Sequence, residues 1–144
     1  MTPGLRSTPR LPDLLLTDGS YAIARLDPDS PIPPWATDGA FWCLCRTHAE
    51  LSIVCPQELM PPGVRAEIDW ACLEVAGPLD LSQVGILAAL THPLAEAGVG
   101  LFALSTFNTD YLFVRQSQLA SALAALRRAG WNVRRSQHRP DTAP

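Results

Sequence analysis

The second half of the chain alternates between two hydrophobic periodicities, and their order limits the folds open to it. Short runs rich in branched and aromatic residues predict strands at residues 72–75, 99–104, 111–114 and 131–134. Between them lie two segments with apolar residues near a 3.6 spacing, at residues 80–98 and 117–130. The order β-α-β-β-α-β predicts an α+β unit in which two helices cover one face of an antiparallel four-stranded sheet, the ferredoxin-like arrangement.

The first of these helices carries start and stop signals. Asp80 can cap its N-terminus, with Gln83 as the capping-box partner three residues on, and Gly98 can end it. Pro93 lies inside this segment and cannot donate a hydrogen bond to the carbonyl of Ala89. We therefore expect a kink or a break at Pro93.

The first half of the chain follows a similar plan with its helices reduced. Runs at residues 14–16 and 21–26 are separated by turn residues and predict a hairpin, and runs at 41–46 and 51–55 predict a second one. Four prolines within residues 27–34 leave room for at most one helical turn between the hairpins.

An internal comparison supports this likeness between the halves. Without gaps and at an offset of 60 residues, the second hairpin of the first half lies over the hairpin of the second half, and Glu50 falls on Asp110. We therefore predict two ferredoxin-like modules, the first with reduced helices, and frayed chain ends. The predicted modules are residues 10–66 and 67–137, and the frayed ends are residues 1–9 and 138–144.

Composition and charge exclude several classes of protein. With 47% hydrophobic and 17% charged residues, the 144-residue chain is not disordered as a whole. Polar side chains and a proline interrupt its longest apolar stretch, residues 81–104, so no membrane span is expected. A net charge of -3 argues against general affinity for nucleic acids or acidic membranes. The first fifteen residues contain no apolar core of the signal-peptide type, so we expect a cytoplasmic protein.

The sequence shows no pattern of catalytic or metal-binding residues. Its four cysteines form no C-x-x-C pair and stand at no zinc-ligand spacing with a histidine. No serine or cysteine has a patterned histidine and aspartate around it, and no glycine-rich phosphate loop is present. We expect no metal, no cofactor and no enzymatic activity.

The segment after the predicted strand at 99–104 is rich in polar side chains. Five side chains that can form hydrogen bonds surround Phe107, namely Ser105, Thr106, Asn108, Thr109 and Asp110. They suit a solvated hairpin turn whose side chains bind local backbone groups. They also suit a site for a small zwitterion, with a carboxylate for its ammonium group and a ring to cover its stem. The residues alone leave both interpretations open.

Three stretches of the second half, residues 77–88, 93–99 and 102–114, resemble the ACT-domain family. More narrowly, the chain is similar to small bacterial proteins with two ACT-like modules that are related to the animal cytosolic arginine sensors. The first module shares this likeness at residues 51–55 and 62–67. The most specific part is the motif Ser-Thr-Phe-Asn-Thr-Asp-Tyr at residues 105–111.

The resemblance implies modules that bind an amino acid or a related effector at an interface and regulate another process. It places ligand contacts at the end of the first predicted helix, in the hairpin, and in the loop before that helix. With the polar hairpin residues included, the candidate site residues are Ser82, Gly85, Glu96, Gly98, Val99, Ser105, Thr106, Phe107, Thr109 and Asp110. Pro93 stands where the sensors have glycine, so arginine itself is not implied as the ligand.

The sequence therefore predicts a non-catalytic small-molecule sensor. Small modules with edge strands need cover for those edges, so we expect a homodimer. The rival interpretation is a protein or nucleic-acid interaction module. Residues 127–144 contain five arginines and one aspartate, and this basic end could contact phosphate groups.

Overall fold

The structure of the protein, a computed structural model, describes residues 11–80 and 83–136. The ends predicted to fray, and Ser82 among the candidate site residues, lie outside the described residues. No helix within the described ranges is long and apolar enough to cross a membrane.

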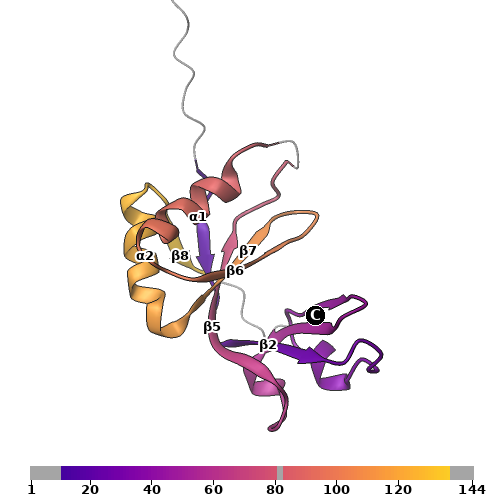
Figure 1. The fold of residues 1–144 in the computed structure, drawn as a ribbon. Helices are drawn as coiled ribbons and strands as arrows, with labels where there is room; N and C mark the ends of the chain where they lie inside the picture. The colour runs from indigo at the N-terminus through magenta and orange to yellow at the C-terminus, as the bar shows by residue number, and fades with distance from the viewer. Residues whose placement is uncertain (1–10, 81–82, 137–144) are drawn as a thin grey trace, which may run out of the picture.

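The second module has the predicted element order. It contains β5 (Ala66–Val75), α1 (Ile86–Glu96), β6 (Leu101–Ser105), β7 (Asp110–Arg115), α2 (Leu119–Arg128) and β8 (Val133–Arg135). Both helices lie on the same side of the sheet (Figure 1). Leu90 and Leu94 of α1 and Leu126 of α2 pack with Leu73 and Leu112 in one buried cluster. The apolar spacing of the sequence groups Val84, Leu87, Ala88, Leu94 and Ala95 on one face of the first helix, and of these only Leu94 is buried. The face of α1 that covers the sheet is formed by Ile86, Leu90 and Leu94 instead.

The strand β1 (Leu14–Leu16) adds a fifth strand to this module. It pairs antiparallel with β5 and parallel with β8, and so lies between them. The predicted hairpin with β2 (Tyr21–Leu26) is wrong, because both strands instead run along the same edge of β5. Between them the amide of Thr17 donates a hydrogen bond of 3.0 Å to the carbonyl of Cys72. The turn residues bend the chain but do not reverse its direction, because the ten-residue strand β5 is long enough to pair with β1 and β2 one after the other.

The first module repeats the topology of the second. It contains β2, the 3-10 helix η1 (Pro34–Thr37), β3 (Cys43–Arg46), β4 (Leu51–Pro56), the 3-10 helix η2 (Gln57–Leu59) and then β5. Its strand order is β3-β4-β2-β5, with each helix of the ferredoxin-like plan reduced to one turn. The predicted hairpin of β3 and β4 is confirmed.

The ten-residue strand β5 belongs to both modules. It is the last strand of the first module and the first strand of the second. At its centre Trp70 pairs with Tyr21 of β2 on one side and with Arg115 of β7 on the other. The module division predicted at residue 66 falls on the first residue of this shared strand.

The two hairpins are equivalent at an offset of 59 residues, and the predicted offset of 60 is wrong by one. In one turn the amide of Thr47 donates to the carbonyl of Glu50, and in the other the amide of Thr106 donates to that of Thr109, each at 2.8 Å. Glu50 therefore corresponds to Thr109 and not to Asp110. The pattern of apolar residues around a turn does not fix the register of the turn itself.

The helix α1 begins five residues later than predicted. Gly85 adopts a left-handed conformation, with φ 92°, and α1 begins at the next residue. Asp80 does not cap the helix, because Leu79 is held in place by a hydrogen bond of 2.7 Å from its amide to the carbonyl of Asn108. The tertiary contact overrides the capping signal and holds Leu79 against the hairpin instead.

The helix α1 continues through Pro93, so a break at this residue does not occur. Proline cannot bind the carbonyl of Ala89, and the indole Nε1 of Trp131 donates a hydrogen bond of 3.1 Å to that carbonyl instead. Trp131 is buried beside the helix. A side chain 42 residues away thus supplies the hydrogen bond that the helix lacks.

Candidate functional site

The segment before α1 and the hairpin of β6 and β7 meet at one end of the sheet (Figure 1). Besides the bond between Leu79 and Asn108, the hydroxyl of Thr109 donates to the carbonyl of Val75, at the end of β5. A Cβ atom on Gly77 would lie 3.1 Å from the carbonyl oxygen of Asn108 and 3.2 Å from the Cβ atom of Thr109. Glycine permits this close approach, which joins the loop to the hairpin.

Two of the candidate site residues form the hairpin turn itself. The hydroxyl of Thr106 donates to the carbonyl of Thr109 at 3.1 Å and accepts a bond from the amide of Thr109 at 3.2 Å. Thr109 is only 4% exposed, and its own hydroxyl is bound to Val75. The solvated-turn interpretation therefore explains both threonines.

Three other residues of the hairpin remain accessible. Ser105 donates a hydrogen bond of 2.6 Å to Oδ1 of Asp110, and among the described residues it is the one hydrogen-bond partner of that carboxylate. Both side chains lie on the face of the sheet that the helices cover, since Leu112 and Val114 alternate with Asp110 on that face. Asp110 is partly exposed, and Phe107 at the tip is 84% exposed. The carboxylate is oriented and open to a ligand.

The N-terminus of α1 lies at this same end of the sheet. Its N-cap residue is Gly85, which has no side chain to cap the helix, and its first turn contains no acidic residue. The first amide groups of a helix and its dipole attract negative charge. Val84, 95% exposed, and Leu87 add apolar surface beside it. The start of α1, which favours negative charge, therefore lies at the same end of the sheet as the carboxylate of Asp110.

The structure places Glu96, Gly98 and Val99 at the opposite end of β6. That five-residue strand separates them from the hairpin by about 16 Å. The carboxylate of Glu96 lies 3.1 Å from Nε2 of His92, Gly98 ends α1 with φ 71°, and Val99 is buried in the core. Within one copy of the chain, these three residues do not join the hairpin.

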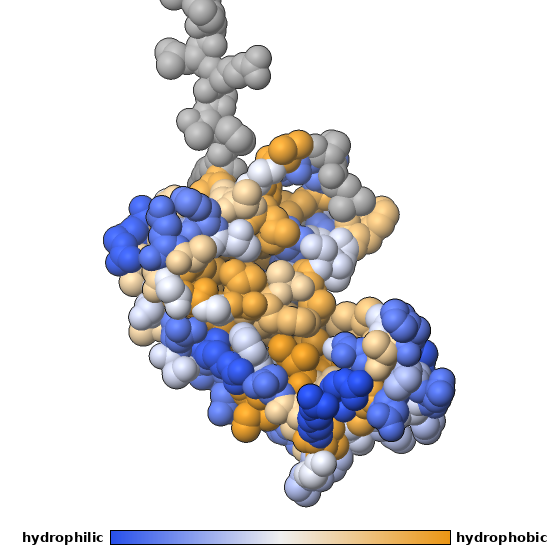
Figure 2. Space-filling view, in the orientation of Figure 1, coloured by the Kyte–Doolittle hydropathy of each residue, from blue (hydrophilic) through white to orange (hydrophobic). Residues whose placement is uncertain are grey.

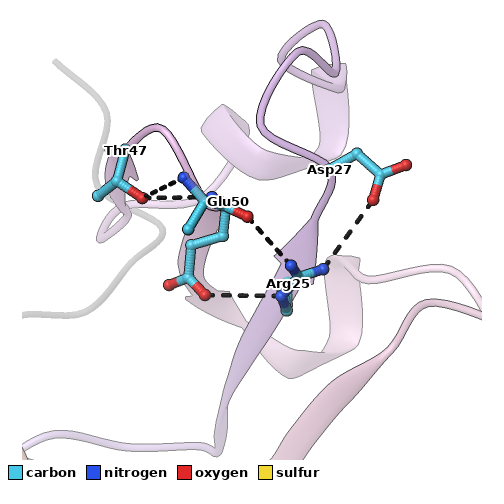
Figure 3. A network of polar contacts seen from close by, with 5 residues as sticks. Arg25, Asp27, Thr47 and Glu50 are labelled. Atoms are coloured by element: carbon cyan, nitrogen blue, oxygen red, sulfur yellow. Dashed lines mark hydrogen bonds and ion pairs between the residues drawn. The ribbon is translucent and has the colours of Figure 1, made fainter.

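The corresponding turn of the first module is closed by an arginine (Figure 3). The guanidinium of Arg25 lies 3.6 Å from the carboxylate of Glu50, 4.0 Å from that of Asp27, and donates to the carbonyl of Ala49. Thr47 accepts hydrogen bonds from two amides of the turn. The acid of this turn is already paired, so the second module provides the better ligand site.

A cavity of about 600 Å³ lies on the face of the sheet away from the helices, and the sequence did not predict it. Its polar and aromatic lining comes from both modules and includes Tyr21, Phe41, Cys72, Glu74, Tyr111 and Arg134. Alternation along β5 and β7 could have placed Cys72, Glu74 and Tyr111 on one face. Phe41 comes from an irregular segment before β3, and no local pattern predicts its position.

Two titratable groups of this cavity remain protonated at neutral pH. Burial raises the pKa of the Cys72 thiol to about 12. Burial, together with the neighbouring carboxylate of Glu74, raises the pKa of the Tyr111 hydroxyl to about 12. Cys72 is therefore a poor nucleophile. Among residues 11–80 and 83–136, no three histidine, cysteine or acidic side chains are grouped to hold a metal ion.

Comparison with known proteins relates this geometry to a family. Residues 65–128 match the model of the ACT domain, and residues 19–62 match the model of an N-terminal domain. The crystal structure of protein Atu0741 from Agobacterium tumefaciens is 38% identical, with a TM-score of 0.83 over 91% of this chain and 97% of that chain. The chain belongs to the ACT-domain family. In ACT terms, the candidate site lies at the loop between the first strand and the first helix of the second module.

The curated relatives of this ACT protein are cytosolic arginine sensors for mTORC1. The human sensor is 31% identical over 74 residues, which are 51% of this chain and 22% of the sensor. The bovine sensor is 28% identical over 104 residues, or 66% of this chain and 31% of the sensor. The chain thus spans about a third or less of their length.

A more distant likeness concerns the fold alone. The regulatory subunit of aspartate kinase from Thermus thermophilus superposes with a TM-score of 0.60 at 14% identity, over 83% of this chain and 99% of that subunit. The α+β fold with two ferredoxin-like ACT modules is therefore confirmed.

Proposed function

We propose that this ACT protein is a non-catalytic regulatory sensor that binds a free amino acid between the loop before α1 and the hairpin of β6 and β7. The observation that carries the proposal is the Ser105–Asp110 pair, whose partly exposed carboxylate lies at the same end of the sheet as the N-terminus of α1, where the N-cap residue is Gly85. The name of its cytosolic relatives supports a place in the cytoplasm.

Each part of an amino acid has a chemical partner in the proposed site. The α-carboxylate binds the first amide groups of α1, where the helix dipole favours an anion. The ammonium group binds Asp110 through a charge-assisted hydrogen bond. Phe107 covers the side chain of the ligand, which buries part of this exposed ring. Thr106 and Thr109 hold the turn in shape, and Glu96, Gly98 and Val99 take no part.

Replacing Asp110 by asparagine should weaken binding of the amino acid by about ten- to one-hundredfold. The substitution keeps the shape and an acceptor for Ser105 but removes the charge that binds the ammonium group, which is worth about 1.5 to 3 kcal/mol. A thermal-shift screen of the twenty amino acids first identifies the ligand, since one at a hundred times its Kd adds about 2.7 kcal/mol to the native state. Titration calorimetry then compares the two proteins.

The matched control is Glu96→Gln, which removes an acid at the other end of β6. This variant should bind the amino acid as the unchanged protein does. If Glu96→Gln weakens binding and Asp110→Asn does not, the ligand lies at the C-terminal end of α1 and the proposed site is wrong.

We also propose that the protein forms a homodimer. The outer edge of β6 has no strand partner within the described ranges, and Val84, Leu87 and Phe107 expose apolar side chains near the proposed site. Sedimentation velocity at tens of micromolar should give a particle of twice the 15.6 kDa chain mass. A monomer at all these concentrations would contradict the dimer but leave the ligand site standing.

Two ion pairs weigh against the rival function of nucleic-acid binding. Arg134 lies 3.1 Å from Asp13, and Arg135 lies 3.0 Å from Asp18. Acidic neighbours thus already compensate half of the four described arginines of the basic end. Stabilisation by nucleic acid but by none of the amino acids, lost at higher salt, would favour the rival function.

A further inference from the structure

The cavity on the open face of the sheet has the build of a small-molecule site. Its floor comes from β5 and β7 of the second module, and its wall is Phe41 from the first module. A volume of about 600 Å³ lies within the range of sites that enclose small organic ligands. Figure 2 shows hydrophobic residues at the surface where the part of the molecule with the helices meets the part that carries β2.

Aromatic rings supply the apolar part of the cavity. The ring of Phe41 lies 4.8 Å from that of Tyr111 and 5.7 Å from that of Tyr21, measured between centroids. The ring of Phe113 packs against these rings, and its centroid lies 5.6 Å from that of Tyr21 and 5.9 Å from that of Phe41. The faces of such rings attract cations as well as apolar groups.

Among the described residues, one carboxylate beside the cavity has no cation within ion-pair distance. Arg134 is paired with Asp13, and Asp18 is paired with Arg135. Glu74 is half-buried, and its one hydrogen-bond partner among the described residues is the neutral hydroxyl of Tyr111, at 3.4 Å. A partly desolvated carboxylate with one long, neutral hydrogen bond favours a cation beside it.

A second hollow adjoins the first and extends its acidic character. It has a volume of about 590 Å³ and shares Asp18, Tyr21, Ala40 and Phe41 with the first cavity. Its lining adds the acids Asp38 and Glu58 and no basic side chain. A ligand that enters from this side passes acidic groups before it reaches the rings.

We propose that the open-face cavity binds a small organic cation, an amine with an apolar stem, as a site separate from the amino-acid site at the hairpin. The ammonium group lies against Glu74, and the stem lies against Phe41, Tyr21 and Tyr111. Because both modules line the cavity, binding there stabilises their relative position. The proposal does not depend on the amino-acid site, which lies on the other face of the sheet.

Three probes of nearly equal shape and different charge test the proposal on the full chain. They are 2-phenylethylamine, its neutral counterpart 2-phenylethanol, and the anion phenylacetate. Titration followed by amide NMR should show binding of the amine at least tenfold tighter than of the other two, with shifts centred on residues 72–74 and 111. Equal binding of the alcohol, no binding of the amine at millimolar concentration, or shifts elsewhere would each overturn the proposal.

Variants separate the charge from the rings. Glu74→Gln should weaken binding of 2-phenylethylamine at least tenfold, and Phe41→Leu should weaken it several-fold. Glu67→Gln is the matched control, since Glu67 lies on the same strand but is exposed and paired with Arg115. This control and Asp110→Asn should leave amine binding unchanged. If Glu74→Gln and Phe41→Leu, both folded by thermal unfolding, bind the amine like the unchanged protein, the assignment is wrong.

Discussion

Replacing Phe113 by alanine should lower the free energy of unfolding by about 3–5 kcal/mol, a large effect for a chain of this size. Phe113 is fully buried on the open face of the sheet. Its ring lies within 6 Å of the rings of Tyr21, Phe41 and Phe102, measured between centroids. These neighbours come from both modules and from two strands, so they cannot collapse together into the space that the lost ring leaves. Urea denaturation followed by tryptophan fluorescence measures the change.

The matched control is Phe107→Ala, which removes the same ring from the same hairpin. Phe107 is 84% exposed, so its loss should change the free energy of unfolding by less than about 0.5 kcal/mol. A similar cost for both variants would show that Phe113 does not join the two modules. Because both substitutions remove a phenylalanine ring from the hairpin of β6 and β7, the comparison isolates the effect of burial.

Local patterns in the sequence predicted the second module well. The 3.6 spacing predicted the helix α1, but the apolar face assigned to it was only partly right: Leu94 faces the sheet, Leu87 is exposed, and Leu90 of the buried face was not assigned to it. The hairpin turn at residues 106–109 was likewise predicted, because its threonines bind backbone groups only three residues away. Such features depend on neighbours along the chain, and a sequence shows those directly.

Features that depend on distant neighbours were not predictable in this way. The bond between Leu79 and Asn108 overrides the capping signal of Asp80, and the bond from Trp131 to Ala89 compensates for Pro93 within the helix. Each joins residues about thirty to forty positions apart. A capping motif or a proline indicates only a local structural preference, and tertiary contacts determine whether the folded chain adopts the preferred structure.

The candidate site shows the same division. Ser105 and Asp110 were singled out from the sequence, and the register of their strands places them opposite one another. The open-face cavity was missed, since Phe41 enters it from a segment without regular structure. The resemblance to a family named Glu96 and Gly98 as ligand contacts together with the hairpin residues, and within one chain β6 lies between these two groups.

Replacing Leu14 by alanine should lower the free energy of unfolding by about 2–5 kcal/mol. β1 is only three residues long, yet it fills the space between β5 and β8. Leu14 is fully buried, pairs with Val75 and Val133, and packs in the cluster beneath the helices. The variant should also speed amide hydrogen exchange in β8, because within the described ranges that strand pairs only with β1.

Leu15→Ala is the control for this prediction, since the next residue of the same strand points to the opposite face. Leu15 is half-buried at the edge of the open-face cavity, so its truncation should cost about 1 kcal/mol and leave exchange in β8 slow. If both variants cost the same and β8 stays protected in each, β1 is not the strand that holds β8. β8 would then have to pair directly with β5, as in a four-stranded ferredoxin-like sheet. Exchange protection at residues 73–75 in Leu14→Ala distinguishes these two arrangements, because direct pairing would keep those amides slow while an open edge would expose them.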